Sequence, residues 1–187
     1  SRLAIIANNE LTFAVASLAC TGLGGQAIPL PASNPVPEIE RKFAASSPDF
    51  VVLGETAALL ADIDLQVPIV HLEAANDATA PIEPCGSDHL AFLMLTSGVT
   101  SDAKVAMLSH GNLSWAQQAI QGRGADGLQA DDVALGVLPF SHIFGLNMVL
   151  LATLRVGGTI VMQRRFNAEA SLKLIADHRI TVLSGAP

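Results

Sequence analysis

Short apolar runs recur along the chain and are separated by stretches of helical period. Runs of four to eight mostly apolar residues bounded by Gly, Pro, Asn or Asp are typical of buried strands. The predicted strands are 3–7, 26–30, 49–53, 68–72, 89–96, 133–139, 159–162 and 180–185. Continuous apolar runs, rather than alternating ones, indicate strands covered on both faces.

Helical patterns lie between most of these strands. Asn8 or Asn9 is expected to cap the first helix and Gly24 with Gly25 to end it. Further helices are predicted over 34–47, 55–61, 112–121, 144–156 and from the Asn167 cap to His178. In the last of these, Leu172, Ile175 and Ala176 are expected to face inward.

The segment 73–88 is rich in Ala, Pro, Asp and Glu and has no period, so it is interpreted as a surface loop joining two lobes of one domain. Strands alternating with helices imply right-handed crossovers. The predicted fold is therefore α/β, with a mostly parallel sheet flanked by helices on both faces.

Composition and charge exclude some classes of function. Of the 187 residues, 50% are hydrophobic and 14% are charged, the net charge is −7, and the mean hydropathy is +0.45. A nucleic-acid surface would be basic, so nucleic acid is not expected as a partner. Cys20 and Cys85 have neither zinc-site nor redox-pair spacing, which favours reduced thiols in a cytoplasmic protein. No transmembrane span is predicted, and peripheral membrane contact stays open.

A hydroxyl-rich loop follows the strongest predicted strand. Thr96, Ser97, Thr100 and Ser101 carry hydroxyls, Gly98 allows close backbone approach, and Lys104 adds a positive charge. Ligands bind beyond the carboxyl ends of parallel strands, and such turns form anion sites. An ordinary polar turn has the same composition. The P-loop of GTPases and ATPases does not match, because Ala103 stands at its second glycine and Val105 at its Ser/Thr.

The sequence TSGVTSDAKVAMLSHGNL resembles the phosphate-loop signature of adenylate-forming enzymes, the superfamily of acyl-CoA synthetases, fatty acyl-AMP ligases and luciferases. The matching positions are Thr96, Ser97, Gly98, Thr100, Lys104, Met107, Leu108, Ser109, His110 and Asn112. LPFSHIFGLNMVLLATLRVGGTIV resembles the family's next motif through Pro139, Ser141, His142 and Gly145. The resemblance extends from the first strand to the end of the chain.

The resemblance implies an ATP-dependent acyl-CoA synthetase of the fatty-acid ligase type, which activates a carboxylic acid as acyl-adenylate and passes it to coenzyme A. It implies that the loop Thr96, Ser97, Gly98, Val99, Thr100, Ser101 and Lys104 binds the ATP phosphates, and that His142 lies at the reacting carboxylate. The apolar region around 139–151 suggests an aliphatic acid, although a buried core helix has the same pattern. ATP, Mg²⁺ and coenzyme A are the implied cofactors, and no metal ligand is assigned to this chain.

Four loop positions depart from the family pattern. The family has Ser or Thr at Val99, Gly at Ser101, Pro at Ala103 and Gly at Val105. Loss of one charge-assisted hydrogen bond at Val99 costs roughly 1.5–3 kcal/mol, and a non-glycine residue at positive φ costs of order 1–3 kcal/mol. A degenerate, non-catalytic relative that binds nucleotide or acyl ligand weakly is therefore an alternative.

The chain is interpreted as the N-terminal portion, 1–187, of the AMP-binding large domain, with the C-terminal catalytic-lysine domain absent. We expect such a fragment to be inactive by itself. A structural α/β module without a ligand is the third hypothesis, and it requires both motif matches to be accidental. Trp115 is expected in the core or in a groove wall rather than stacked on a ligand.

Overall fold

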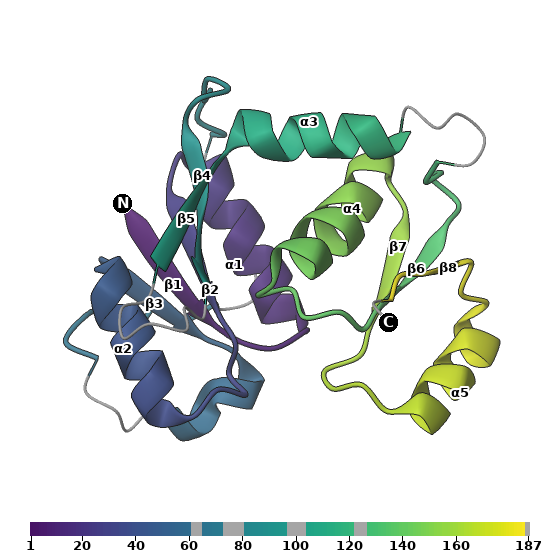
Figure 1. The fold of residues 1–187 in the computed structure, drawn as a ribbon, viewed down its shortest axis with the longest axis horizontal. Coiled ribbons are helices and arrows are strands. Elements are labelled where there is room, and N and C mark those ends of the chain that lie inside the picture. The colour runs from purple at the N-terminus through teal and green to yellow at the C-terminus, as the bar shows by residue number, and fades with distance from the viewer. Residues whose placement is uncertain (61–64, 73–80, 97–103, 122–126, 186–187) are drawn as a thin grey trace. The chain divides into compact units, whose positions relative to one another are not determined.

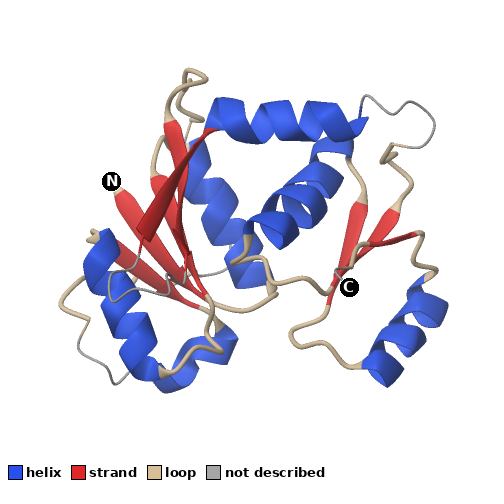
Figure 2. Cartoon of the chain, in the orientation of Figure 1, coloured by secondary structure: helices blue, strands red, loops and turns tan. Residues whose placement is uncertain are grey.

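The chain forms two compact units, Ser1–Gly111 and Asn112–Pro187, each with its own sheet. The computed structural model describes residues 1–60, 65–72, 81–96, 104–121 and 127–185 (Figure 2). The division lies within the first residues of a helix and not in the loop 73–88, where the sequence predicted it. The reason is that the strand following that loop returns to pair with a strand of the same unit.

The N-terminal unit contains a five-stranded sheet of order β3-β1-β2-β4-β5 (Figure 1). Its strands are β1 (Arg2–Ile6), β2 (Gln26–Leu30), β3 (Phe50–Leu53), β4 (Leu90–Thr96) and β5 (Lys104–Ser109). The pairs β1–β2, β1–β3 and β2–β4 are parallel, and β5 is antiparallel to β4. The predicted strand 68–72 is reduced to an isolated bridge between Ile69 and Val51.

Helices lie on both faces of this sheet (Figure 1). They are α1 (Leu11–Gly22) and α2 (Val36–Ser46), and a 3-10 helix η1 (Glu55–Leu60) follows β3. Ala4 and Ile6 of β1 share one buried cluster with Ile39 and Phe43 of α2. Ile5, which points to the opposite face, is also fully buried. Burial on both faces explains the continuous apolar runs of these strands.

The N-terminus of α1 differs from the prediction. The capping position is Glu10 rather than Asn8 or Asn9, and its side chain makes no capping hydrogen bond. The carboxylate is instead turned toward η1, where it accepts from the Thr56 hydroxyl at 2.9 Å. At the other end Gly24 has a φ of 73°, as predicted for the glycine that ends this helix.

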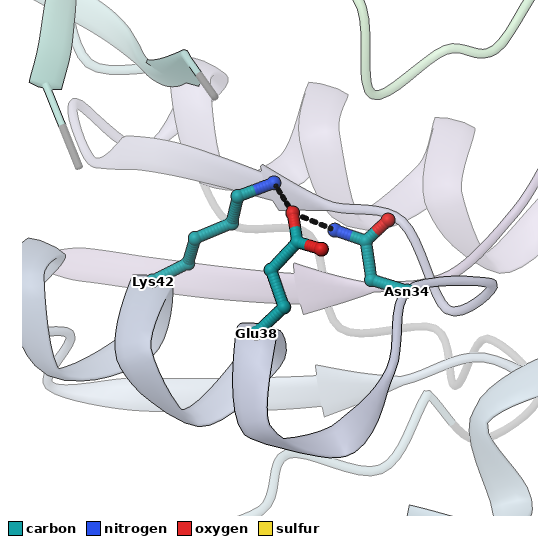
Figure 3. Close-up of polar contacts among 3 residues, drawn as sticks. All are labelled: Asn34, Glu38 and Lys42. Atoms are coloured by element: carbon teal, nitrogen blue, oxygen red, sulfur yellow. Dashed lines mark hydrogen bonds and ion pairs between the residues drawn. The ribbon is translucent and has the colours of Figure 1, made fainter. Parts of the chain in front are cut away.

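A polar cluster stabilises the first turns of α2 (Figure 3). The Glu38 carboxylate lies 2.6 Å from the Lys42 amine and accepts from the Asn34 amide at 3.1 Å. The hydrogen bond from Lys42 lowers the pKa of Glu38. A carboxylate in the first turn also complements the helix dipole, so this contact helps to fix α2 over the sheet.

The C-terminal unit has a three-stranded parallel sheet of order β7-β6-β8. Its elements are β6 (Val133–Gly136), the π-helix η3 (Phe144–Leu151), α4 (Ala152–Val156), β7 (Thr159–Met162), α5 (Ala168–His178) and β8 (Val182–Leu183), while α3 (His110–Gln121) begins at the end of the N-terminal unit. The helix predicted over 144–156 is thus a π-helix that continues as an α-helix. Leu146, Val149 and Leu150 of η3 are buried in the core of this unit.

At α5 one prediction is confirmed and one is wrong. Asn167 caps the helix, because its Oδ1 accepts from the Ala170 amide at 2.9 Å. The inward face was wrongly assigned, since Leu172 is 69% exposed and the buried residue is Ser171, whose hydroxyl donates to Gln163 at 2.7 Å. A buried polar contact therefore replaces the apolar stripe that the spacing predicted.

The α/β class and the mostly parallel sheet arrangement are confirmed. Among the described residues, no helix is long and apolar enough to span a bilayer. Cys20 and Cys85 are both thiols, and burial raises the pKa of Cys20 to about 11.

Candidate functional site

The first motif lies on a hairpin. Thr96 ends β4, Lys104 begins β5, and these two residues are partners in the antiparallel register. Directly paired residues in such a ladder have Cα atoms about 4.5–5.5 Å apart. The fold thus brings the two ends of the predicted phosphate loop together. Ser97, Gly98, Val99, Thr100 and Ser101 lie outside the described residues.

The sequence predicted that this loop leads into a helix, and the structure inserts β5 between them. Burial explains why the strand was missed. β4 has Ala91 to Met94 buried, whereas β5 shows no regular alternation and leaves Met107 65% exposed. The Lys104 side chain is exposed. β4, which ends at the first residue of the predicted loop, is paired with strands on both sides, β2 and β5.

The second motif follows β6 in the C-terminal unit and forms a tight turn. The His142 amide donates to the Pro139 carbonyl at 3.0 Å, and the His142 carbonyl accepts from the Leu146 amide at 2.9 Å. Phe140 is fully buried and lies against Gly136, where an added Cβ would come within 2.9 Å of its ring. The turn is therefore anchored by an aromatic side chain directed into the core.

A close backbone contact explains why this motif has glycine at position 145. A Cβ added there would lie 2.2 Å from the Pro139 carbonyl oxygen and 2.7 Å from that of Leu138. Both atoms are backbone, so no side-chain rotation relieves the clash. The close approach of the first turn of η3 to residues 138–139 requires glycine at this position.

The His142 ring is exposed and its orientation is set by the backbone. The Phe144 amide donates to His142 Nδ1 at 3.3 Å. Because Nδ1 accepts, the proton of the neutral ring is on Nε2. The simpler expectation, a ring that donates to a carbonyl at a strand end, does not describe this contact. His142 is thus held as a donor with Nε2–H as its outer atom, which suits an oxyanion.

Of the other histidines, His71 and His178 are exposed, whereas His89 and His110 lie close together in the N-terminal unit. His89 Nε2 donates to the Gly24 carbonyl at 2.9 Å, and the His110 amide donates to the His89 carbonyl at 2.9 Å. The Nε2 atom of His110 is buried without a hydrogen-bond partner. Desolvation, with a smaller contribution from His89, lowers the pKa of His110. The bond from the His110 amide to the His89 carbonyl joins the first residue of α3 to the residue before β4.

Three polar residues near the second motif were not predicted. Gln117 of α3 and Asn147 of η3 are 8% and 4% exposed, and their side chains are hydrogen-bonded at 2.9 Å. Arg155 of α4 donates to Gln117 at 3.3 Å. The one signal in the sequence was the single Asn within the apolar run 143–151. Trp115, expected in the core or a groove wall, is 73% exposed.

No group of three or more His, Cys, Asp or Glu within the described ranges could hold a metal ion.

Comparison with known proteins supplies the family. The profile of the AMP-binding enzyme family matches residues 1–187. The chain belongs to the AMP-binding enzyme family. It is 35% identical to a feruloyl-CoA synthase of Amycolatopsis sp over all of its length, and 30% identical to 4-coumarate–CoA ligase 5 of Oryza sativa subsp. japonica, again over all of its length.

Its fold is similar to that of ATP-bound MatB from Rhodopseudomonas palustris, with a TM-score of 0.80 and 27% identity over 99% of this chain and 39% of that one. The chain spans 38% of the length of each of the two curated relatives. The resemblance that the two motifs indicated is thus confirmed at the level of the AMP-binding family.

Proposed function

We propose that the protein of which this chain forms a part is an ATP-dependent acid–thiol ligase that activates a carboxylic acid as its adenylate and transfers the acyl group to coenzyme A. The observation that carries the proposal is the second motif, where the backbone holds His142 with Nε2–H as its outer donor. A donor fixed in this way stabilises charge that develops on an oxygen, without reorganising during the reaction.

The two motifs have different proposed roles. Thr96, Ser97, Gly98, Thr100 and Lys104 hold the β- and γ-phosphates of ATP through hydroxyls, backbone amides and one charge, with Val99 and Ser101 as part of the same loop. His142 donates to the carboxylate or to the α-phosphate oxygen to which it becomes joined. Carboxylate attack on the α-phosphorus forms the acyl–phosphate bond and releases pyrophosphate, so the protein's part is positioning and charge stabilisation.

The acid proposed is an aryl-propenoic acid of the ferulate and coumarate class. The support is that feruloyl-CoA synthase and 4-coumarate–CoA ligase match this chain over its full length. The sequence alone favoured an aliphatic acid from the apolar segment 139–151. Much of that segment is accounted for by the core, because Leu146, Val149 and Leu150 are buried. Activation of an aliphatic acid stays a prediction, and the pyrophosphate-exchange assay described below tests it.

Coenzyme A is the proposed acceptor, and Mg²⁺ is proposed to enter with ATP as its phosphate-bound counter-ion. We further propose a cytoplasmic location, where ATP and coenzyme A are supplied. The 187 residues are proposed to be the N-terminal part of the large domain, and to lack adenylating activity by themselves.

A pyrophosphate-exchange assay on the full-length protein tests the activity. Exchange dependent on ferulate or coumarate, and weaker with hexanoate or palmitate, supports the proposal. His142→Ala should reduce exchange, and His178→Ala, at the exposed end of α5, is the matched control. Exchange by the 187 residues alone would contradict the proposed inactivity of the fragment.

The second candidate, a degenerate relative, rests on Val99 and Ser101 in the phosphate loop. Calorimetric titration of the full-length protein with ATP distinguishes it. No heat at millimolar ATP, together with no exchange on any acid, would favour the non-catalytic relative over the ligase.

A further inference from the structure

A buried amide pair joins α3 to the π-helix that follows the second motif. Gln117 Nε2 donates to Asn147 Oδ1 at 2.9 Å, and both residues are almost fully buried. The neighbours of Asn147 in η3, Leu146, Val149 and Leu150, are apolar and buried. A leucine at position 147 would fit this setting without requiring a partner, so the asparagine calls for an explanation beyond packing.

Arg155 determines which way the pair is oriented. Its guanidinium has donors only, so the Gln117 atom that it contacts at 3.3 Å is the acceptor Oε1. The other end of the same amide, Nε2, must then face Asn147, whose facing atom must be the acceptor Oδ1. Three elements, α3, η3 and α4, are therefore linked in a single arrangement of donors and acceptors.

Asn147 lies one helical turn after His142. The backbone between them is closed by the bond from the Leu146 amide to the His142 carbonyl, and the Phe144 amide of the same turn holds the His142 ring. On its other side this turn is fixed by the contact of Gly145 with the backbone of 138–139. A shift of η3 at Asn147 would therefore move the amide that orients His142.

π-helical turns are rare and are often found at functional sites, where they are retained by specific contacts. A buried hydrogen-bonded pair is directional, whereas apolar packing tolerates sliding and rotation. The pair is thus suited to hold η3 at one rotation relative to α3.

We propose that Gln117 and Asn147, oriented by Arg155, are positioning residues that hold the first turn of η3, and with it the His142 ring, in the arrangement needed for acid activation. The proposal rests on the proposed function, because it assigns the pair to the step in which His142 acts. It predicts effects on turnover rather than on ATP binding.

The test uses the full-length protein, four single variants of the pair and its control, the His142→Ala variant, and the double variant of His142→Ala with Asn147→Leu. Asn147→Leu and Gln117→Met remove the pair at nearly constant volume. Gln117→Glu keeps an acceptor for Arg155 and a second acceptor to which Asn147 can donate after its amide flips. Gln118→Met makes the same chemical change as Gln117→Met one residue further along α3, where the side chain is exposed.

We expect Asn147→Leu and Gln117→Met to lower kcat for pyrophosphate exchange by about 10-fold to 10²-fold, as misplacement of a reacting group does, while KM for ATP changes less than about twofold. Gln117→Glu should recover most of the loss, and Gln118→Met should resemble the parent. In a His142→Ala background, Asn147→Leu should cause no further loss. An equal loss in both backgrounds, or a lowered melting temperature with unchanged kcat, would overturn the proposal.

A second readout does not depend on turnover. With ¹³C-labelled histidine, the ring signal that disappears in His142→Ala is assigned to His142. It should report the Nε2–H form in the parent and in Gln117→Glu, and should shift or broaden in Asn147→Leu. If it moves while the parent shows no exchange, the positioning role stands and the proposed function fails. If it is unchanged in Asn147→Leu, the positioning role is wrong whatever the activity.

Discussion

The two motif regions are built by different means. The first is the end of a hairpin, where Thr96 and Lys104 are register partners at the tips of β4 and β5. The second is a turn after β6, fixed by the buried Phe140 ring, by the Gly145 backbone contact and by hydrogen bonds at both ends of His142. The hairpin brings two chain segments together, whereas the turn aims one side chain.

This difference matches the chemistry proposed for each. Phosphate oxygens are surrounded well by many weak donors, so a loop with hydroxyls and backbone amides is sufficient and tolerates single changes. A group that acts on developing charge must be fixed within a fraction of an ångström. We therefore expect changes near the turn to be more severe than changes in the loop.

Removal of the His142 side chain should have the largest effect. If Nε2–H stabilises charge during adenylation, His142→Ala lowers kcat by roughly 10²–10³-fold, as loss of one such donor does in other enzymes. Pyrophosphate exchange by the full-length protein measures it. The fold should be unaffected because the ring is exposed. A loss below threefold would remove His142 from the mechanism.

Gly145→Ala tests whether the turn needs its close backbone contact. The added methyl would meet the Pro139 carbonyl oxygen at 2.2 Å, and such overpacking typically costs about 1–3 kcal/mol. Thermal and denaturant unfolding should show the loss, with activity decreasing in parallel.

Gly22→Ala is the matched control for that substitution. Nothing lies within 4 Å of the position where its Cβ would be, and it is the last residue of α1. We expect a neutral or slightly stabilising effect, as for glycine replacement at an unstrained site. Equal destabilisation by the two substitutions would show that the contact at Gly145 is unimportant.

In the first motif we expect a substitution that raises the affinity for ATP. Val99→Thr restores the hydroxyl that the family pattern has there, and one charge-assisted hydrogen bond of roughly 1.5–3 kcal/mol corresponds to about tenfold or more in affinity. Isothermal titration of the full-length protein with ATP measures the change. Val99→Ala, which shortens the side chain without adding a donor, should bind no better than the parent; an equal gain there would exclude the hydroxyl as its cause.

The smallest effect is on the pH dependence of stability, and it arises from His110 at the start of α3. The pKa of His110 is lowered from 6.5 by desolvation, so the unfolded chain binds more protons than the folded one near that pH. The stability that neutral His110 contributes to the folded state is therefore fully present above pH 6.5 and decreases as the pH falls below it. A decrease of a few degrees in melting temperature between pH 7.5 and 5.5 is expected.

His110→Gln should flatten this dependence, because it keeps a polar side chain that does not titrate. His178→Gln, the same substitution at an exposed helix end, is the matched control. If the slope persists in His110→Gln and disappears in His178→Gln, the assignment to His110 is wrong.

Pattern alone predicted most strands and helices, and it failed where tertiary contacts replaced local rules. Glu10 occupies the capping position of α1 in place of Asn8 or Asn9 because its carboxylate finds Thr56 in η1. The strand β5 was missed because its burial does not alternate, and only pairing with β4 makes it a strand. The run 68–72 has strand composition, yet it contributes only the bridge at Ile69.

By itself the sequence determined the α/β class, the alternation of strands and helices, and membership of the AMP-binding family, because these follow from local periodicity and from two ordered motifs. Only the tertiary structure decided which nitrogen of His142 carries its proton, why Gly145 must be glycine, and that Gln117 meets Asn147. These depend on contacts between residues that are distant in the chain or on the exact path of a turn. Such contacts leave no period in the sequence, since a buried pair can join any two helices that the fold brings together.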